Sequence, residues 1–201
     1  MIRRFSALVL FALLGFALPS PAAESDYAKL LAVLKSGNTH IDYQQLRFDY
    51  MESPEFKQAK DTTATESAMV QAMNAKDFAK ALACAEEVLA GQYVNLDAHY
   101  AAYQASKALG QNDKAEFYRA VFHGLVQSIL NSGDGAKPES AWVVISVHEE
   151  YVVLSILGMR PGTQSVIHKD GHSYDEMKVK DEKGAEHTYY FNVDIPFKHY
   201  L

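Results

Sequence analysis

The hydrophobic pattern of this chain changes at residues 132–135, whose sequence is Ser-Gly-Asp-Gly. Before this stretch, apolar side chains recur every three or four residues, which is the spacing of one face of an α-helix. After it, apolar side chains alternate with polar ones or form runs rich in Val and Ile, as in β-strands. The sequence therefore predicts an α+β fold, with N-terminal helical hairpins packed on a C-terminal antiparallel β meander.

The helical part, residues 24–132, carries five apolar stripes, or six when a short second one is counted as a helix. Asp42 is expected to cap that short helix, which must end before Pro54. Thr63 and Glu66 have the spacing of a capping box, and a further helix is expected to begin near Asn95. The stripes lie within residues 27–34, 46–51, 69–73, 78–89, 96–103 and 118–129.

Two short segments of the helical part are similar to each other. Residues 76–81 and 110–115 are offset by 34 residues, and each resembles the turn that opens the second helix of a tetratricopeptide hairpin. The apolar stripes at 78–89 and 118–129 match at a different offset of 40 residues. The two competing periods leave two interpretations open, which are degenerate tetratricopeptide-like hairpins and an irregular helical bundle.

The β part, residues 138–195, is expected to form four or five antiparallel strands joined by short turns. Asp170-Gly171 is a strong hairpin signal, and residues 181–184 are a second hairpin loop. One face of such a meander must be buried, and the preceding helices are the expected cover. Residues 24–201 are therefore predicted to form a single domain. The expected strands lie within residues 142–147, 151–157, 164–168, 173–179 and 187–193.

The first 23 residues have the pattern of a secretory signal peptide. A short basic start, Met1–Arg4, precedes an uncharged apolar core, and small residues follow at Ala22-Ala23. The apolar core is too short to serve as a membrane span in the mature protein. We expect cleavage near Ala22-Ala23 and a mature protein that is periplasmic or secreted.

The composition argues against several classes of function. The chain has 19 Lys and Arg against 25 Asp and Glu, a formal net charge of −6. Removing the predicted signal peptide leaves 17 against 25 and a net charge of −8. An acidic chain without a basic cluster argues against binding to nucleic acid or to anionic membranes. Cys84 is the only cysteine, so no internal disulfide can form, and its apolar neighbours predict an inert buried thiol.

Four short motifs are spread over residues 41–191: 42–47 (Asp-Tyr-Gln-Gln-Leu-Arg), 132–135 (Ser-Gly-Asp-Gly), 149–151 (Glu-Glu-Tyr) and 190–191 (Tyr-Phe). Together they resemble a family of secreted bacterial proteins known only as a domain of unknown function. The resemblance covers most of the mature chain and implies an exported protein with a helical part and a β part. It implies no activity, substrate or catalytic residue.

Glu149 and Glu150 interrupt a long apolar run and are the main candidates for a functional site. The run is too long for one ordinary strand, so we expect the pair either at a solvated bend or in a strand, on opposite faces. In the second case one carboxyl group would point toward the helical layer beside Tyr151, with a raised pKa suited to a general acid. His148 is a further candidate, but the second His of a zinc protease helix is missing.

A second candidate site lies at Gly133, Asp134 and Gly135. Two glycines around an acid permit positive φ and let backbone N–H groups converge into an anion-binding nest. The alternative is an ordinary helix end followed by a tight turn.

His168 and His172 flank the turn at Asp170. Across a tight hairpin they can approach each other, and Asp170 or Asp175 can join them on a metal ion. A polar hairpin tip explains the same residues without a metal, and the sequence predicts no metal and no cofactor.

Two classes of function remain open. The first is a non-enzymatic binding or assembly module of the cell envelope, with a protein partner and a tyrosine-lined groove. The second is a small hydrolase-like enzyme with Asp134, Glu149, Glu150 and His148 gathered where the helices meet the sheet. The sequence has no nucleophile elbow, paired metal motif or dinucleotide fingerprint, which favours the module. Carboxylates that converge in one pocket would favour the enzyme, and scattered carboxylates the module.

Overall fold

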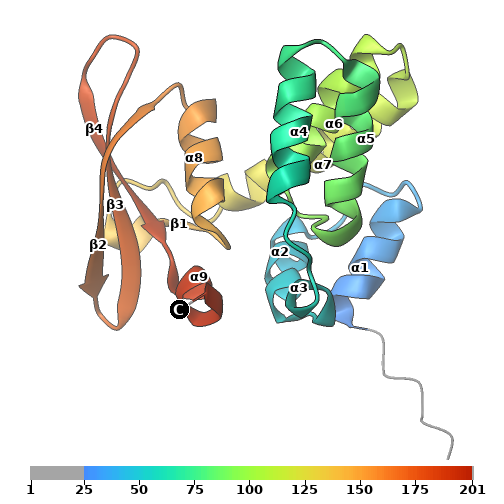
Figure 1. Ribbon diagram of the computed structural model, residues 1–201. Helices are drawn as coiled ribbons and strands as arrows, with labels where there is room; N and C mark the ends of the chain where they lie inside the picture. The colour runs from blue at the N-terminus through green and yellow to red at the C-terminus, as the bar shows by residue number, and fades with distance from the viewer. Residues whose placement is uncertain (1–24, 201) are drawn as a thin grey trace, which may run out of the picture.

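The computed structural model describes residues 25–200 and is a mixed structure of helices and sheet (Figure 1). Helices make up the first half of the described chain, and a four-stranded sheet lies in the second half. The predicted α+β class is therefore confirmed. The helices of the first half are α1 (Asp26–Lys35), α2 (Tyr43–Glu52), α3 (Pro54–Lys57), α4 (Thr63–Asn74), α5 (Phe78–Gly91), α6 (Leu96–Ala108) and α7 (Asn112–Leu130).

The sheet has the strand order β1-β4-β3-β2. Its three long strands, β2 (Arg160–Lys169), β3 (His172–Lys180) and β4 (Glu186–Asn192), form the expected antiparallel meander. The two-residue strand β1 (Trp142–Val143) follows the 3₁₀ turn η1 (Pro138–Ser140) and pairs in parallel with β4. The sheet is therefore mixed, and a last helix, α9 (Asp194–Tyr200), follows it.

The segment after β1 is a helix, α8 (Val147–Ile156), and the prediction of strands at 142–147 and 151–157 is wrong beyond the two residues of β1. Ser146 caps α8, since its hydroxyl accepts a hydrogen bond from the backbone N–H of Glu149. Apolar side chains lie all around this helix, with Leu154 buried and Ile156 exposed. A segment that is apolar on every side has no helical stripe, and its β-branched residues imitate a strand.

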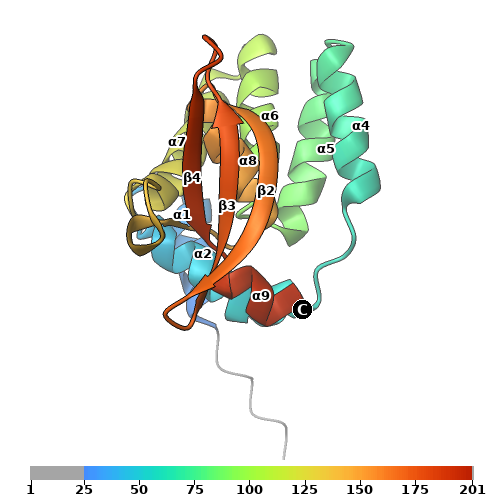
Figure 2. The same cartoon turned by 90° about the vertical axis from the view of Figure 1, so that its left-hand side faces the viewer.

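Helix α8 covers the face of the sheet that looks toward the helical half (Figure 1). We expected the preceding helices to take this position, but they lie beyond α8. The opposite face of the sheet is turned away from all of these helices (Figure 2). Because α8 lies between the two layers, it is the element at which both halves can contribute side chains to one site.

Helices α4 to α7 form two consecutive hairpins, α4–α5 and α6–α7, which pack against each other (Figure 1). Helix α5 begins at Phe78 and α7 at Asn112, which is 34 residues later. The 34-residue offset therefore relates the two hairpins. The 40-residue offset of the apolar stripes relates no pair of helix starts.

The helix starts agree with two of the expected caps. Asp42 and Asn95 each accept a hydrogen bond from the backbone N–H three residues further on. The capping box expected for Thr63 and Glu66 does not form. Thr62 is the residue at the cap of α4, and its hydroxyl donates to the Glu66 carboxylate.

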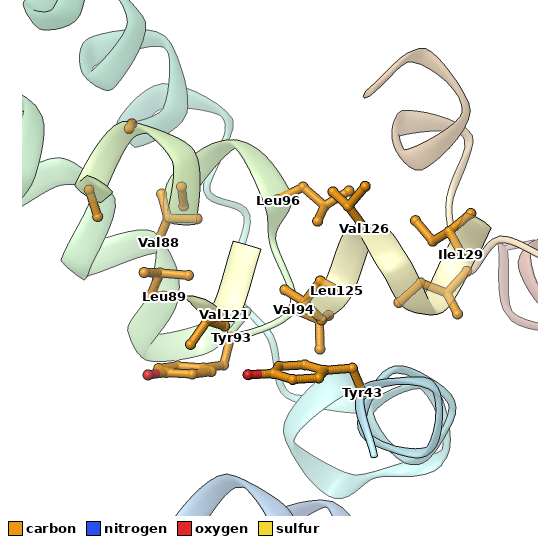
Figure 3. Packing of buried hydrophobic residues seen from close by; sticks show 14 of the residues in the cluster. Tyr43, Val88, Leu89, Tyr93, Val94, Leu96, Val121, Leu125, Val126 and Ile129 are labelled. Atoms are coloured by element: carbon orange, nitrogen blue, oxygen red, sulfur yellow. The ribbon is translucent and has the colours of Figure 1, made fainter. Parts of the chain in front are cut away.

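One cluster of buried apolar side chains runs from the helical half to the sheet. In the helical half, Val121 and Leu125 of α7 lie above Tyr43 of α2 and Tyr93 of the α5–α6 connection (Figure 3). Gly124 makes the contact with α2 possible, because a Cβ at this position would come within 2.2 Å of the Tyr43 ring. Helix α7 is thus packed closely on α2 at a point where no larger residue fits.

Burial differs from the sequence interpretation at two residues, Phe122 of the 118–129 stripe and Cys84. Leu82 is buried, as its stripe predicts, but Phe122 is only half-buried because it faces a hollow beside Tyr100. Cys84 is also half-buried rather than fully buried, and it packs against the edge of the core.

The predicted signal peptide and its cleavage site fall on residues 1–23, outside the residues that the structure describes. Between residues 25 and 200, no helix combines the length and the apolar character needed to cross a membrane.

Candidate functional site

A groove lies between the helical half and the first turn of α8. It consists of hollows of about 600, 490 and 350 Å³, and His148 lines all three. The hollows are therefore parts of one depression around the His148 side chain. One wall comes from α2, α3, α4, α6, α7 and the α3–α4 and α5–α6 connections, and the other comes from α8 and the residues just before it.

His148 bridges α8 and α6 across this groove. Its Nε2 atom lies 2.9 Å from Oδ2 of Asp97, and both side chains are about half exposed. The hydrogen bond to Asp97 raises the pKa of His148, and the nearby charges of Glu66 and Glu149 add to the increase. The acidic groups around His148 thus favour its protonated form.

Aromatic side chains line the 490 Å³ hollow. Tyr100 of α6 and Phe122 of α7 pack together with ring centroids 5.3 Å apart, and Tyr151 of α8 also lines the hollow. Tyr100 is 47% exposed and Tyr151 41%. Exposed aromatic residues are enriched where proteins bind other proteins, because each ring offers a large apolar surface and tyrosine adds a polar hydroxyl.

Glu149, which lines the 600 Å³ hollow, belongs to a buried ion pair with Arg47. Arg47 of α2 donates from Nε and Nη2 to the two carboxylate oxygens of Glu149, at 2.9 and 2.5 Å. The remaining donors of Arg47 reach the Ser128 hydroxyl and the Val143 carbonyl, and the Ile145 N–H donates to Glu149. This pair holds the start of α8 against the helical half, and its carboxylate is fully engaged by hydrogen bonds.

Glu150 points toward the sheet and is completely buried beside Asp175 of β3. Gln164 of β2 donates from Nε2 to both carboxyl groups, at 3.4 Å to Glu150 and 2.5 Å to Asp175. The Tyr151 hydroxyl donates to Oε1 of the same Gln164 at 3.1 Å. Burial, followed by the negative charge of Asp175, raises the pKa of Glu150 to about 9.

The two glutamates are therefore not at a solvated bend, which corrects that interpretation of the sequence. They lie in the first turn of a helix, and both are buried. Glu149 faces Arg47 in the helical half, and Glu150 faces Asp175 in the sheet.

Residues 133–135 form a closed turn, which corrects the idea of an open anion-binding nest. The N–H groups of Asp134 and Gly135 both donate to the Ser140 carbonyl, at 3.0 and 2.8 Å. The Gly133 carbonyl accepts from the Trp142 indole. Gly135 has φ of +67°, and a Cβ there would come within 2.5 Å of the Trp142 ring. The chain itself occupies the donors, and the exposed Asp134 does not line the groove.

The hairpin tip does not gather a set of metal ligands. His168 contacts the Ser173 hydroxyl, and His172 contacts Asp194, whereas Asp175 is buried beneath α8. Within residues 25–200, no group of three or more His, Cys, Asp and Glu side chains is placed to hold a metal ion.

Three site residues were missed by sequence reasoning, namely Arg47, Asp97 and Gln164, and Asp175 was considered only as a metal ligand at the hairpin tip. A signal existed for Arg47, because it falls on the buried stripe of α2 between Tyr43 and Met51. A lone arginine on an apolar stripe indicates a buried partner of opposite charge. Asp97 and Gln164 are ordinary polar residues of a helix and a strand, and nothing in their local sequence marks them.

A family model described as a domain of unknown function, DUF4919, matches residues 19–201 and so spans every residue that the structure describes. No curated protein matches the chain, and no solved structure does. The match covers most of the sequence, and the chain belongs to the DUF4919 family of domains of unknown function.

Proposed function

We propose that this chain is an exported binding module of the cell envelope, and that the groove around His148 receives a segment of a partner protein. The two helical hairpins supply most of one wall in the manner of tetratricopeptide repeats, and α8 supplies the other. The partner segment carries an apolar or aromatic side chain next to a basic one.

The observation that carries this proposal is the combination of aromatic and acidic side chains in one groove. Tyr100, Phe122 and Tyr151 offer apolar surface on both walls. Asp97 lines the same hollow and Glu66 lines the other two hollows of the groove, and their negative charge favours a basic group on the ligand.

The charge of the groove supports a basic partner rather than an acidic one. Its basic side chains are Lys60 and His148, against the acidic Asp61, Glu66 and Asp97, while the charge of Glu149 is offset by Arg47. A hydrophobic surface with complementary charge at its rim is the usual composition of a protein-binding site.

The alternative, a hydrolase-like enzyme, has less support from the geometry. Its candidate groups point to different places: Asp134 to Ser140, Glu149 to Arg47, and Glu150 to Asp175. Glu150 has a raised pKa, but it is fully buried and lines none of the hollows of the groove. General acid catalysis needs a proton donor within hydrogen-bond reach of the substrate.

Affinity capture from envelope extract tests the binding proposal. We expect the unaltered protein to retain a discrete partner that Tyr100→Ser loses. Val33→Ser is the matched control, because Val33 is a similarly exposed apolar residue, 41% against 47%, on α1 and outside the groove. Equal retention by both variants would mean that the groove is not the binding site.

Export has its own test. The N-terminus of the protein recovered outside the cytoplasm should begin after Ala22 or Ala23. An intact Met1 on that product would contradict the predicted signal peptide.

A further inference from the structure

Two buried carboxyl groups each leave one oxygen without a donor. Glu150 is 0% exposed and Asp175 2%. Gln164 satisfies Oε2 of Glu150 and Oδ2 of Asp175. The remaining oxygens, Glu150 Oε1 and Asp175 Oδ1, are buried and receive no hydrogen bond from the part of the protein that the structure describes. Buried acceptors without donors are rare in proteins and require an explanation.

We propose that Glu150 and Asp175 share a single proton between Oε1 and Oδ1, as a carboxylic acid hydrogen-bonded to a carboxylate. One proton gives a partner to both of the unsatisfied oxygens at once. It also removes one of two negative charges, because neighbouring carboxylates in a buried site cannot both ionise at neutral pH.

The surroundings of the pair favour this proton. The charged groups that act on Glu150 are Asp175 of β3 and Glu149 of α8, and both are acidic. Glu149 is already paired with Arg47 of α2, and the neighbours from β2 and α8 contribute the Gln164 amide and the Tyr151 hydroxyl. Burial and the adjacent carboxylate accordingly raise the pKa of Glu150 to about 9.

Two hydrogen bonds connect the shared proton to the groove. Gln164 binds both carboxyl groups and accepts from the Tyr151 hydroxyl, and Tyr151 lines the groove beside Phe122. When the proton is lost, both Glu150 and Asp175 carry a negative charge beside the Gln164 amide. Their repulsion displaces Gln164 or the start of α8. The pair thereby makes the groove wall dependent on pH, a step that rests on the proposed function of the groove.

The first test detects the proton in the unaltered protein, without any partner. In a carboxyl ¹³C NMR titration, we expect one carboxyl of the pair to stay protonated at pH 7 and to titrate near pH 9. Two fully ionised carboxylates at pH 7 would overturn the proposal. This measurement decides the question even if a variant fails to fold.

The second test uses the pH dependence of unfolding. The unfolded chain loses this proton near the ordinary value of 4.5, but the folded chain keeps it until about pH 9. Between these values the folded state holds one proton more, so its stability falls as the pH rises and the unfolding constant increases about tenfold per pH unit.

Glu150→Gln removes the proton site and this dependence. The ratio of the unfolding constant of the unaltered protein to that of Glu150→Gln should rise about tenfold per unit between pH 6 and 8. Glu176→Gln is the matched control, because Glu176 is the next residue on β3, points to the other face and bonds Tyr190. The ratio of the unfolding constant of the unaltered protein to that of Glu176→Gln should stay constant over the same pH range. A constant ratio for Glu150→Gln would contradict the shared proton.

The third test follows Tyr151 itself. Its ring NMR signals should shift with the same midpoint as the carboxyl pair, and Glu150→Gln should abolish the shift, while Tyr190 on the outer face stays unaffected. If the pair holds a proton but the Tyr151 ring signals do not shift when it is lost, the pair does not control the groove wall. If both are observed and no partner binds the groove, the proposed function fails and the shared proton stands.

Discussion

Replacement of Glu149 by Gln should lower the free energy of unfolding by about 3–5 kcal/mol. Arg47 is 0% exposed and Glu149 3%, and the pair joins α2 to α8. Gln has nearly the volume of Glu, so the change leaves a buried guanidinium without a countercharge rather than a cavity. The expected loss is a large part of the roughly 5–15 kcal/mol that stabilises a typical domain.

Urea denaturation measures this loss, and the chain offers a matched control. Glu116 also receives two hydrogen bonds from one arginine, Arg119, but this pair lies on the surface of α7 with both side chains at least 45% exposed. Glu116→Gln should therefore cost much less than Glu149→Gln, because water solvates the arginine that remains. Burial is the main difference between the two substitutions.

A double variant separates the charge from the shape of the site. Arg47→Met combined with Glu149→Leu removes both charges and should recover much of the stability lost in Glu149→Gln, since apolar replacements of buried pairs are often neutral or stabilising. A loss for Glu149→Gln no larger than that for Glu116→Gln would refute the reasoning from burial. A double variant no more stable than the single one would show that the hydrogen bonds, rather than the charges, fix α8.

Three further outcomes are expected. Burial lowers the pKa of His99 in the folded protein to about 4, from an ordinary value of 6.5. As the pH falls below 6.5, His99 therefore takes up a proton in the unfolded chain before it does so in the folded protein. The stability of the unaltered protein relative to His99→Gln should therefore decline by about 1.4 kcal/mol per unit from pH 6.5 toward pH 4, as measured by urea midpoints. Leu82→Ala should cost about 2–5 kcal/mol, against almost nothing for the exposed Lys114→Ala, and equal midpoints would show that the apolar stripe of α5 is misplaced. Gly124→Ala should destabilise by about 1–3 kcal/mol despite the higher helix propensity of Ala, because its Cβ would meet the Tyr43 ring at 2.2 Å. A thermal melt that shows stabilisation would contradict this contact.

The helical half could be predicted from the sequence because its signals are local. Asp42 and Asn95 lie at the caps of their helices, and the apolar stripes match α1 and α4 to α7. The antiparallel meander was predictable for the same reason, since its turn at Asp170 and its alternating strands are encoded within a few residues.

Helix α8 could not be predicted in this way. Its environment is set by two layers that are distant in sequence, so Val153 and Leu154 are buried while Val147 and Tyr151 are exposed, with no single apolar face. Tertiary packing decides between helix and strand in such a segment, and the β-branched residues favoured the wrong choice.

The partners of the two glutamates were equally hidden. Arg47 lies 102 residues before Glu149, and only the fold brings them together. The sequence marked Glu149 and Glu150 as unusual because carboxylates within an apolar run are costly unless paired. It did not show that one has an arginine as its partner and the other an aspartate.

The most direct test of the groove as the binding site is photo-crosslinking in the cell envelope. A benzoylphenylalanine in place of Tyr100 samples the groove, and one in place of the exposed Lys178 samples the outer face of the sheet. We predict a discrete adduct from position 100 that is absent from position 178. The same adducts from both positions, or none from position 100 while position 178 gives one, would contradict the account.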